Sequence, residues 1–278
     1  MMIFTPEEKQ KFAANYPAQP VLFNHQLETH ELFTLERLVE LSQSLPKDRV
    51  EYNSGKVPVS QDPDKTPSNN LSVAETIRSI EENGSWMALK NIETDPAYND
   101  LFETCLGELK QVIGSKTGDM YRKEAFIFIT SPGSVTPFHM DPEHNILLQL
   151  RGEKTVQVYP ANDPKIISQV QHEEFHAGGH RNLIHEKAFD QRATAFTLTP
   201  GQALNIPLKA PHWVQNGDQV SISMSITWRS SASDKEINIH LMNRKLRERG
   251  FTPAHIGTHV MRDKAKAFGY KVLERFSR

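Results

Sequence analysis

The chain of 278 residues has little cysteine and no long apolar run. Its only cysteine, Cys105, excludes an intrachain disulfide, and its place in Leu-Phe-Glu-Thr-Cys-Leu predicts a small buried helix residue rather than a nucleophile. No apolar stretch approaches the length that spans a bilayer, and the N-terminus lacks a charged region followed by a long apolar core. We therefore expect a cytoplasmic protein with no membrane partner.

Composition and charge place the chain among ordinary globular proteins. Hydrophobic residues make up 37% and charged residues 24%, and the length suffices for a substantial core. The net charge of −2 is uneven, because residues 234–278 carry eleven Lys or Arg against five Asp or Glu. Nucleic-acid binding would need interleaved aromatics or a recognisable fold, and neither is evident. The basic segment favours a solvated helical face that also contacts a partner subunit.

The first 120 residues are predicted to be mostly helices and connecting loops. A capping box at residues 72–75 opens one helix, and the Asp-Pro pair at residues 95–96 opens another. Residues 53–70 are rich in polar residues and Pro, which predicts a long surface loop. Loops of this length in compact domains often act as lids or binding elements.

From residue 125 the pattern changes to short strands with Gly and Pro turns, which favours an antiparallel sandwich or barrel. Residues 151–153 are predicted to form a tight hairpin connection. Residues 236–249 return to a helix with an apolar face, which indicates a homodimer contact if no core partner covers it. The predicted strands are residues 125–130, 146–150, 155–159, 195–198, 203–206 and 220–228.

We accordingly expect three parts. Residues 1–120 form an N-terminal helical and loop region that packs on the barrel, residues 121–233 form the barrel core, and residues 234–278 form a C-terminal helical extension.

A metal site is the first candidate for function. His139 and Asp141 are two residues apart on a predicted extended strand, so both side chains project from the same face. His212, in Ala-Pro-His-Trp, is a third candidate ligand. Two imidazoles and one carboxylate form the facial triad of non-haem Fe(II) oxygenases, which leaves three coordination positions open. Either histidine alone is more often a structural residue, so the assignment depends on the combination.

Lys154 strengthens this interpretation, because it could direct its ammonium group into the same barrel. A buried lysine is unfavourable unless an anion meets it. A dicarboxylate co-substrate would chelate the iron at one end and pair with Lys154 at the other. The alternative is an exposed turn residue, since Gly-Glu-Lys is also favourable turn chemistry.

The order of these motifs resembles the JmjC (cupin-type) Fe(II)/2-oxoglutarate oxygenases, most of all the protein hydroxylase branch that includes the asparaginyl hydroxylase of hypoxia-inducible factor. The likeness covers about a hundred residues, and its ordered combination is specific. That family's pattern is Thr, two residues, His-x-Asp, a later Asn, Gly-x-Lys, and a distal His before a strand that ends in Trp. The matching residues here are Thr136, His139, Asp141, Asn145, Gly152, Lys154, His212 and Trp228.

The resemblance implies an eight-stranded jelly-roll, the double-stranded β-helix. It also implies that the triad binds Fe(II), that Lys154 and Thr136 hold the distant carboxylate of 2-oxoglutarate, and that Asn145 lines the pocket. Phe128 and Trp228 are further candidates for the co-substrate pocket, although core packing explains Phe128 equally well. The hydroxylase branch places a Tyr on an upstream strand near the co-substrate, and this chain has only Trp-Met-Ala-Leu at residues 86–89.

The implied reaction consumes 2-oxoglutarate and O2, releases succinate and CO2, and hydroxylates an unactivated C–H bond. A protein or peptide side chain is the substrate that the resemblance favours, and demethylation is the same chemistry on an N-methyl carbon. A small-molecule substrate is the alternative.

Two competing interpretations remain. Residues 172–176, His-Glu-Glu-Phe-His, fit the zinc-protease pattern, but the following Ala-Gly-Gly would end the helix at once. We therefore interpret residues 161–190 as an insertion between barrel strands near the mouth of the site. The other interpretation is a cupin-like binding or regulatory module without catalysis, because a fold alone never proves activity.

Overall fold

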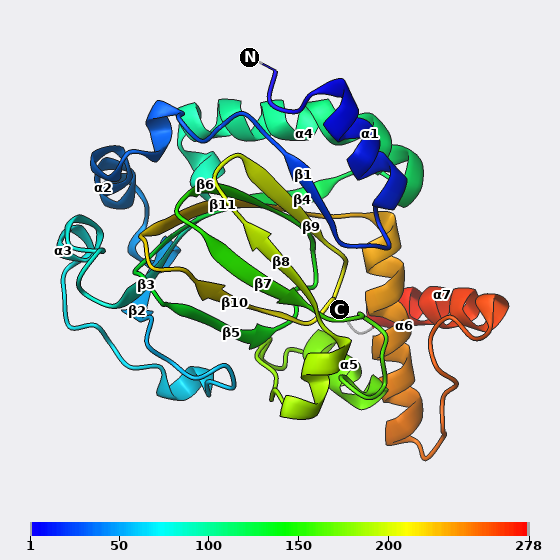
Figure 1. Ribbon diagram of the computed structural model, residues 1–278. Coiled ribbons are helices and arrows are strands. Elements are labelled where there is room, and N and C mark those ends of the chain that lie inside the picture. The colour runs from blue at the N-terminus through cyan, green and yellow to red at the C-terminus, as the bar shows by residue number, and fades with distance from the viewer. Residues whose placement is uncertain (1, 277–278) are drawn as a thin grey trace.

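Two antiparallel β-sheets face each other in the computed structural model, which describes residues 2–276 (Figure 1). The larger sheet consists, in spatial order, of β1 (Val21–Asn24), β9 (Gln202–Ile206), β6 (His144–Arg151), β11 (Ser221–Arg229), β4 (Tyr121–Thr130), β3 (Ser85–Lys90) and β2 (Val50–Ser54). The smaller sheet consists of β5 (Val135–His139), β10 (His212–Asn216), β7 (Lys154–Val158) and β8 (Thr194–Leu198). The predicted fold class, a mainly β jelly-roll with helices at both ends, is confirmed.

Strand β11 shows how the sequence sets the two faces of the larger sheet. Successive side chains of a strand project to opposite faces. Ile222, Met224 and Ile226 belong to the main hydrophobic core, on the outer face of the sheet, which the N-terminal helices cover. The alternate residues Ser223 and Ser225 are buried on the inner face, toward the smaller sheet. The space between the sheets therefore has polar side chains as well as apolar ones.

Helices surround the sheets on two sides. The helices α1 to α4 contribute to the same core as the outer face of the larger sheet, whereas α5, α6 and α7 lie together beside one end of the barrel (Figure 1). The helices are α1 (Pro6–Asn15), α2 (Leu35–Ser44), α3 (Val73–Arg78), α4 (Pro96–Thr117), α5 (Gln169–His176), α6 (Ser231–Glu248) and α7 (Val260–Phe276). Short 3-10 helices are Glu31–Phe33, Lys47–Arg49, Pro63–Lys65, Ile92–Thr94 and Lys187–Arg192.

The predicted helix starts are confirmed. Ser72 and Glu75 form the expected capping box at α3, and Asp95 caps α4. The description of residues 1–120 as mostly helix and loop is wrong in one respect, because β1, β2 and β3 all lie there and extend the larger sheet. These strands are short and lack clean alternation, so periodicity alone does not separate them from buried helix segments. The division of the chain at residues 120 and 233 stays a prediction.

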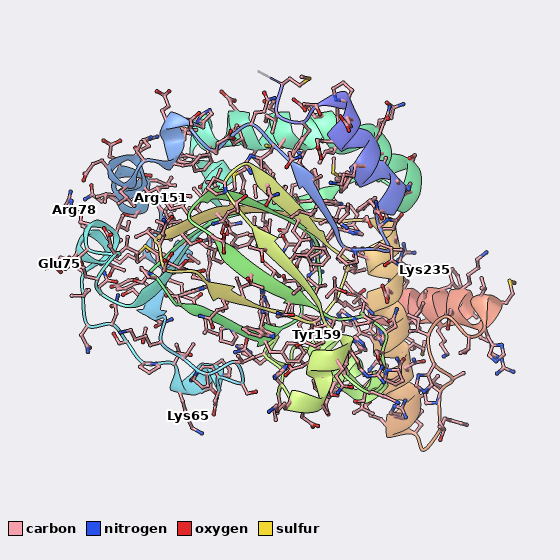
Figure 2. All side chains as sticks on the ribbon, viewed as in Figure 1. Lys65, Glu75, Arg78, Arg151, Tyr159 and Lys235 are labelled. Atoms are coloured by element: carbon pink, nitrogen blue, oxygen red, sulfur yellow. The ribbon has the colours of Figure 1, made fainter. Side chains whose placement is uncertain are left out.

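The predicted hairpin at residues 151–153 is wrong. Strand β6 pairs with β9 and β11, whereas β7 pairs with β8 and β10, so the connection crosses from one sheet to the other. Gly152 permits this crossing with a φ of 67°, and the Val220 carbonyl occupies the space that a Cβ at this position would need. Strand β7 then runs from the end of the barrel near Arg151 to the end near Tyr159, which lies beside α5 (Figure 2).

The C-terminal extension is helical, as predicted, but its exposed apolar face lies elsewhere. Helix α6 packs against both α5 and α7, which leaves Ile239 only 3% exposed. The exposed apolar side chains lie instead on α7, where Met261 is 75% and Phe268 is 71% exposed. Among the helices that the structure describes, none is long and apolar enough to cross a membrane.

The crossing between the sheets gives a stability prediction. A Cβ at Gly152 would meet the Val220 carbonyl oxygen at 2.2 Å, whereas a Cβ at Gly133, which has the same φ of 67°, would meet nothing within 4 Å. We expect Gly133→Ala to lower the free energy of unfolding by about 1 kcal/mol, through backbone strain alone. Gly152→Ala should lower it by at least about 2 kcal/mol, because overpacking adds to the strain. Urea unfolding of both variants measures the difference, and equal losses would contradict the crossing geometry.

Candidate metal centre

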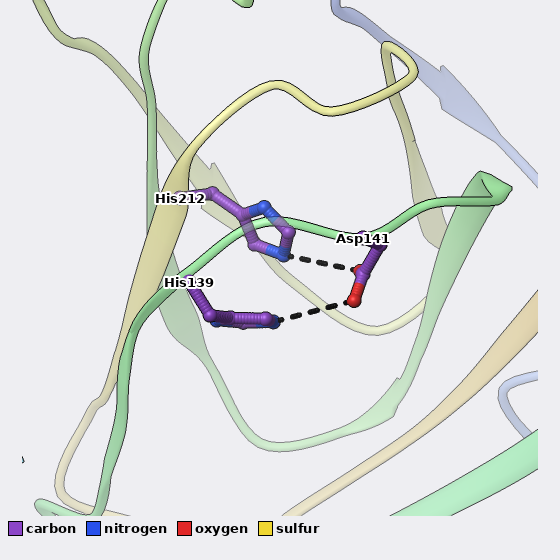
Figure 3. A group of neighbouring side chains, drawn as sticks. All are labelled: His139, Asp141 and His212. Carbon is purple, nitrogen blue, oxygen red and sulfur yellow. Dashed lines mark ion pairs between the residues drawn. The ribbon is translucent and has the colours of Figure 1, made fainter. Parts of the chain in front are cut away.

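The side chains of His139, Asp141 and His212 converge on one another (Figure 3). They lie at the end of the barrel near Tyr159, because His212 pairs with Val158. His139 is the last residue of β5 and lies opposite His212, the first residue of β10. Asp141 lies two residues beyond the end of β5, not on the strand as predicted, yet its carboxylate still turns toward both rings. The Nε2 atoms of His139 and His212 lie 3.8 and 3.7 Å from its two oxygens. One ligand atom from each residue lies within 4.8 Å of the others.

Backbone carbonyls orient both imidazole rings. Nδ1 of His139 donates to the Pro137 carbonyl at 2.7 Å, and Nδ1 of His212 donates to the Ala210 carbonyl at 2.9 Å. A histidine whose Nδ1–H is bound in this way presents the lone pair of Nε2. Both Nε2 atoms are therefore available as metal ligands.

The electrostatics of the centre suit a divalent cation. Burial by itself would raise the pKa of Asp141, but His139, His212, Arg181 and Asn145 together hold it below its usual range. Burial and the neighbouring His212 lower the pKa of His139. At neutral pH Asp141 is thus a carboxylate and the His139 ring is neutral, which are the forms that bind metal. This donor set on one side of an ion fits Fe(II).

A β-bulge brings Thr136 to the same face as the ligands. Strand β10 pairs His212 with His139 and Val214 with Thr136, so β5 has one extra residue between the two pairs. The Trp86 indole donates to the Thr136 hydroxyl at 3.0 Å, and its ring lies 5.7 Å from that of Phe128. Trp86 therefore supplies a polar hydrogen from β3, a strand upstream of the three ligands.

Lys154 is buried inside the barrel and is not an exposed turn residue. Only 4% of it is exposed, its ammonium donates to the Ser223 hydroxyl at 2.9 Å, and burial lowers its pKa to about 7. Among residues 2–276, no carboxylate forms an ion pair with it. Lys154 pairs with Asn216, which lies four residues from His212 along β10. Lys154 and His212 therefore project toward the same interior. The Cα atoms of Asn216 and His212 are separated by roughly 13 Å along the strand.

Of the other predicted site residues, Asn145 contacts the metal ligands and Trp228 does not. Asn145 lies in the centre: its amide donates to Asp141 at 3.2 Å and accepts from Ser225 at 2.7 Å. Trp228 lies on the outer face of β11, in the main core, and its ring stacks on that of His144 with 5.3 Å between the ring centroids. Its assignment to the co-substrate pocket is therefore not supported by its position.

Strand β5 is at the edge of its sheet, and two loops form hydrogen bonds to it beside the metal centre. The Phe138 amide donates to the Val59 carbonyl at 2.8 Å, and the Leu183 amide donates to the Phe138 carbonyl at 2.8 Å. The side chain of Asn182 donates to the Gln61 carbonyl at 3.1 Å, which joins the two loops. The polar loop that sequence analysis found and the insertion between β7 and β8 thus both lie at the mouth of the site.

Arg181 is a site residue that sequence reasoning missed. Its guanidinium donates to Asp141 at 2.9 Å from the insertion, while the side chain remains 54% exposed. No motif surrounds Arg181, and only the pairing of residues 181–183 with β5 brings it to the centre.

The zinc-protease pattern does not form a second metal site. Residues 172–176 are helical, as the pattern requires, but Glu173 pairs with Arg247 at 2.8 Å. The rings of His172 and His176 stack on His240, at 5.0 and 5.3 Å. Within the described part of the chain, the triad is the group whose ligand atoms converge.

Comparison with known proteins defines the class. A model of the cupin-like domain matches residues 25–234. Since this is more than half of the chain, the protein belongs to the cupin-like domain family. The resemblance to JmjC-type proteins is confirmed by similarity to the lysine-specific demethylase JMJ30 of Arabidopsis thaliana, 29% identical over 116 residues, which are 36% of this chain and 24% of that protein.

Another relative matches a larger part of the chain, and solved structures share its fold. HSPB1-associated protein 1 of Bos taurus is 29% identical over 153 residues, which are 51% of this chain and 31% of the relative. The chain thus spans less than a third of that relative. Among solved structures, Escherichia coli ycfD has a TM-score of 0.55 at 14% identity, with 98% of this chain and 68% of that chain covered. The complex of this ribosomal oxygenase with cobalt and 2-oxoglutarate has a TM-score of 0.51 at 13% identity, with 98% and 67% covered. At these identities the likeness shows the fold.

The geometry gives a binding prediction. Replacement of His139 or His212 by Ala should abolish stoichiometric binding of Co(II) or Mn(II), because two remaining ligands hold a divalent ion weakly. Isothermal titration calorimetry on the apoprotein measures the loss. His255→Ala, at an exposed histidine, is the matched control and should bind as wild type does. Undiminished binding by the triad variants would refute the ligand assignment.

Proposed function

We propose that the protein is an Fe(II)- and 2-oxoglutarate-dependent oxygenase that hydroxylates a C–H bond of a protein or peptide side chain, with release of succinate and CO2. The observation that carries the proposal is the pairing of a convergent His-Asp-His group with a buried lysine that lacks a carboxylate partner among the described residues. The His-Asp-His group suits a divalent metal ion, and the buried lysine requires an anion.

The residues that would bind a dicarboxylate follow one another along β10 and its neighbouring strands. His139 and His212 mark one end, Thr136 lies opposite Val214 along the way, and Lys154 marks the other end. Bound iron would supply the redox chemistry that activates O2 toward a C–H bond. Lys154 and Thr136 would hold the distant carboxylate of the co-substrate and so fix the position of its other end. The apolar cluster between the sheets would exclude water from the bound co-substrate.

A protein substrate is supported by the names of similar proteins. One is a lysine-specific demethylase and another is a ribosomal oxygenase, and both names describe action on macromolecules. A small-molecule substrate and a non-catalytic metal-binding module are the contrary outcomes. Succinate formation that depends on an added peptide supports the protein hydroxylase. Succinate formation that depends only on an added metabolite would show that the substrate is a small molecule. Tight metal binding without any turnover would favour the non-catalytic metal-binding module.

The buried lysine gives a prediction for co-substrate affinity. Lys154→Met should weaken binding of 2-oxoglutarate by about 10- to 100-fold, because a hydrogen-bonded charge pair is lost. Calorimetry with the Mn(II)-loaded protein measures this without turnover. An unchanged affinity would remove Lys154 from the co-substrate site.

The same lysine predicts a pH dependence. Burial lowers the pKa of Lys154 to about 7, so without a bound co-substrate a growing fraction of this side chain is uncharged above that pH. A bound carboxylate favours the charged form, so binding above pH 7 requires uptake of a proton. The dissociation constant of 2-oxoglutarate should therefore rise by up to about tenfold per pH unit above 7. Lys154→Arg should remove the rise, because arginine stays charged.

We also propose that the protein forms a homodimer through α7. Met261 and Phe268 lie seven residues apart on one face of α7, and both are mostly exposed. Residues 234–278 carry a local charge of +6 and residues 1–233 carry −8. Packing of this helix on the body of a second copy would cover the apolar face and bring opposite charges together.

Oligomeric state tests this contact. Light scattering should give twice the chain mass of 31.6 kDa for the wild type and the monomer mass for a Met261→Glu, Phe268→Glu double variant. Ile184→Glu, at an exposed apolar residue outside α7, is the control that should remain dimeric. A monomeric wild type would exclude the dimer.

A further inference from the structure

Lys209 combines two features that are unusual for a lysine. It is 1% exposed, and its backbone has a φ of 59°, in the left-handed region that non-glycine residues seldom adopt. It lies in the turn at residues 207–210, between β9 and β10, where the Ala210 amide donates to the Pro207 carbonyl at 2.9 Å. The reaction proposed above does not use this side chain. Some other interaction must therefore stabilise the turn in this conformation.

The backbone of the turn contacts two of the three metal ligands. The Lys209 amide donates to the Asp141 carbonyl at 3.1 Å. The Ala210 carbonyl accepts from Nδ1 of His212 at 2.9 Å, which fixes the orientation of that ring. Displacement of this turn would therefore change the positions of Asp141 and His212 together.

The side chain of Lys209 extends away from the metal centre to α6. Its ammonium forms an ion pair with Glu236 and lies 3.2 Å from Nε2 of His240. Glu236 and His240 are four residues apart, on the same face of α6. Burial and the Lys209 charge both lower the pKa of His240, so its ring is neutral and Nε2 can accept from the ammonium.

Helix α5 packs against α6 beside these side chains. The rings of His172 and His176 both stack on His240, so the charged end of Lys209 lies in a buried polar cluster between two helices. Figure 1 shows both helices beside the same end of the barrel. Displacement of the turn would break the ion pair between Glu236 and the Lys209 ammonium, whose side chain is only 1% exposed, and the cost of a buried charge without a partner opposes that displacement.

We propose that Lys209 is a positioning residue through which α6 sets the metal affinity of the His139, Asp141 and His212 centre. Its side chain is fixed in the helices, and its backbone fixes the turn that orients two ligands. The C-terminal helical extension is thus a structural part of the metal centre. Supporting groups around metal ligands commonly change metal affinity by 10- to 100-fold when they are removed.

Calorimetric titration of the full-length apoprotein with Co(II), in the absence of substrate, tests this role. Lys209→Met keeps an apolar stem but removes the charge, and it should weaken Co(II) binding by about tenfold. Glu236→Gln, which keeps the shape of the partner, should weaken binding in the same direction and to a smaller extent. Lys266→Met is the matched control, because Lys266 is a mostly buried lysine that bonds to the Ala254 carbonyl within the same helical extension. It should bind Co(II) as the wild type does.

A second measurement separates positioning from general stability. Urea unfolding gives the stability of each variant, and the visible spectrum of bound Co(II) reports the ligand geometry. A purely structural role would lower the free energy of unfolding of Lys209→Met while the Co(II) affinity and spectrum of the folded protein stay unchanged, and this result would overturn the proposal. If Lys209→Met does not fold, Glu236→Gln decides: weaker Co(II) binding than in Lys266→Met supports the proposal, and equal binding overturns it.

Discussion

Burial of the Asp141 carboxylate is the constraint on which the functional part of this structure depends. A carboxylate removed from water must be compensated by charge or by hydrogen bonds. Here Asn145, Arg181, His139 and His212 surround it. His139 and Asn145 belong to the strands just before and just after Asp141, whereas Arg181 lies in the insertion and His212 begins β10. The strands, the insertion and the β9–β10 connection therefore have to meet at this point. Their meeting produces a centre that is already arranged for a cation.

The interior of the barrel is consistent with this requirement. Many sandwich proteins fill the space between two sheets with apolar side chains, but β11 here directs a row of hydroxyl groups inward. Ser223 accepts a hydrogen bond from Lys154, and Ser225 donates one to Asn145. One strand thus supports both ends of the proposed co-substrate site. A single rigid element thus fixes the spacing between the metal ligands and the lysine.

The sequence was sufficient to predict the centre because its chemistry is concentrated in short motifs. The triad, Asn145 and the buried position of Lys154 follow from residue type, order and likeness to a family. Arg181 and Lys209 could not be found in this way, because long-range pairing brings them to the site and no local pattern marks them.

The errors in the fold prediction have similar causes. Strands β1 and β3 are short, and apolar and polar residues do not alternate in their sequences. The turn at Gly152 has the local chemistry of a hairpin, although the strands on its two sides belong to different sheets. Trp228 matches the family pattern in sequence, but strand alternation places it on the outer face. Local signals identified elements well and their partners poorly.

The contribution of residues 1–120 to the larger sheet also limits how this protein could be divided. A fragment that began at residue 121 would lack β1, β2 and β3, and it would expose the backbone edges of β9 and β4 to solvent. Unprotected edges of this kind recruit other chains and promote aggregation. It would also lose Trp86, and with it the hydrogen bond to Thr136. The hydrogen bond to Thr136 and the protection of the sheet edges therefore depend on the same early strands, and a shorter version of the protein would have to replace both.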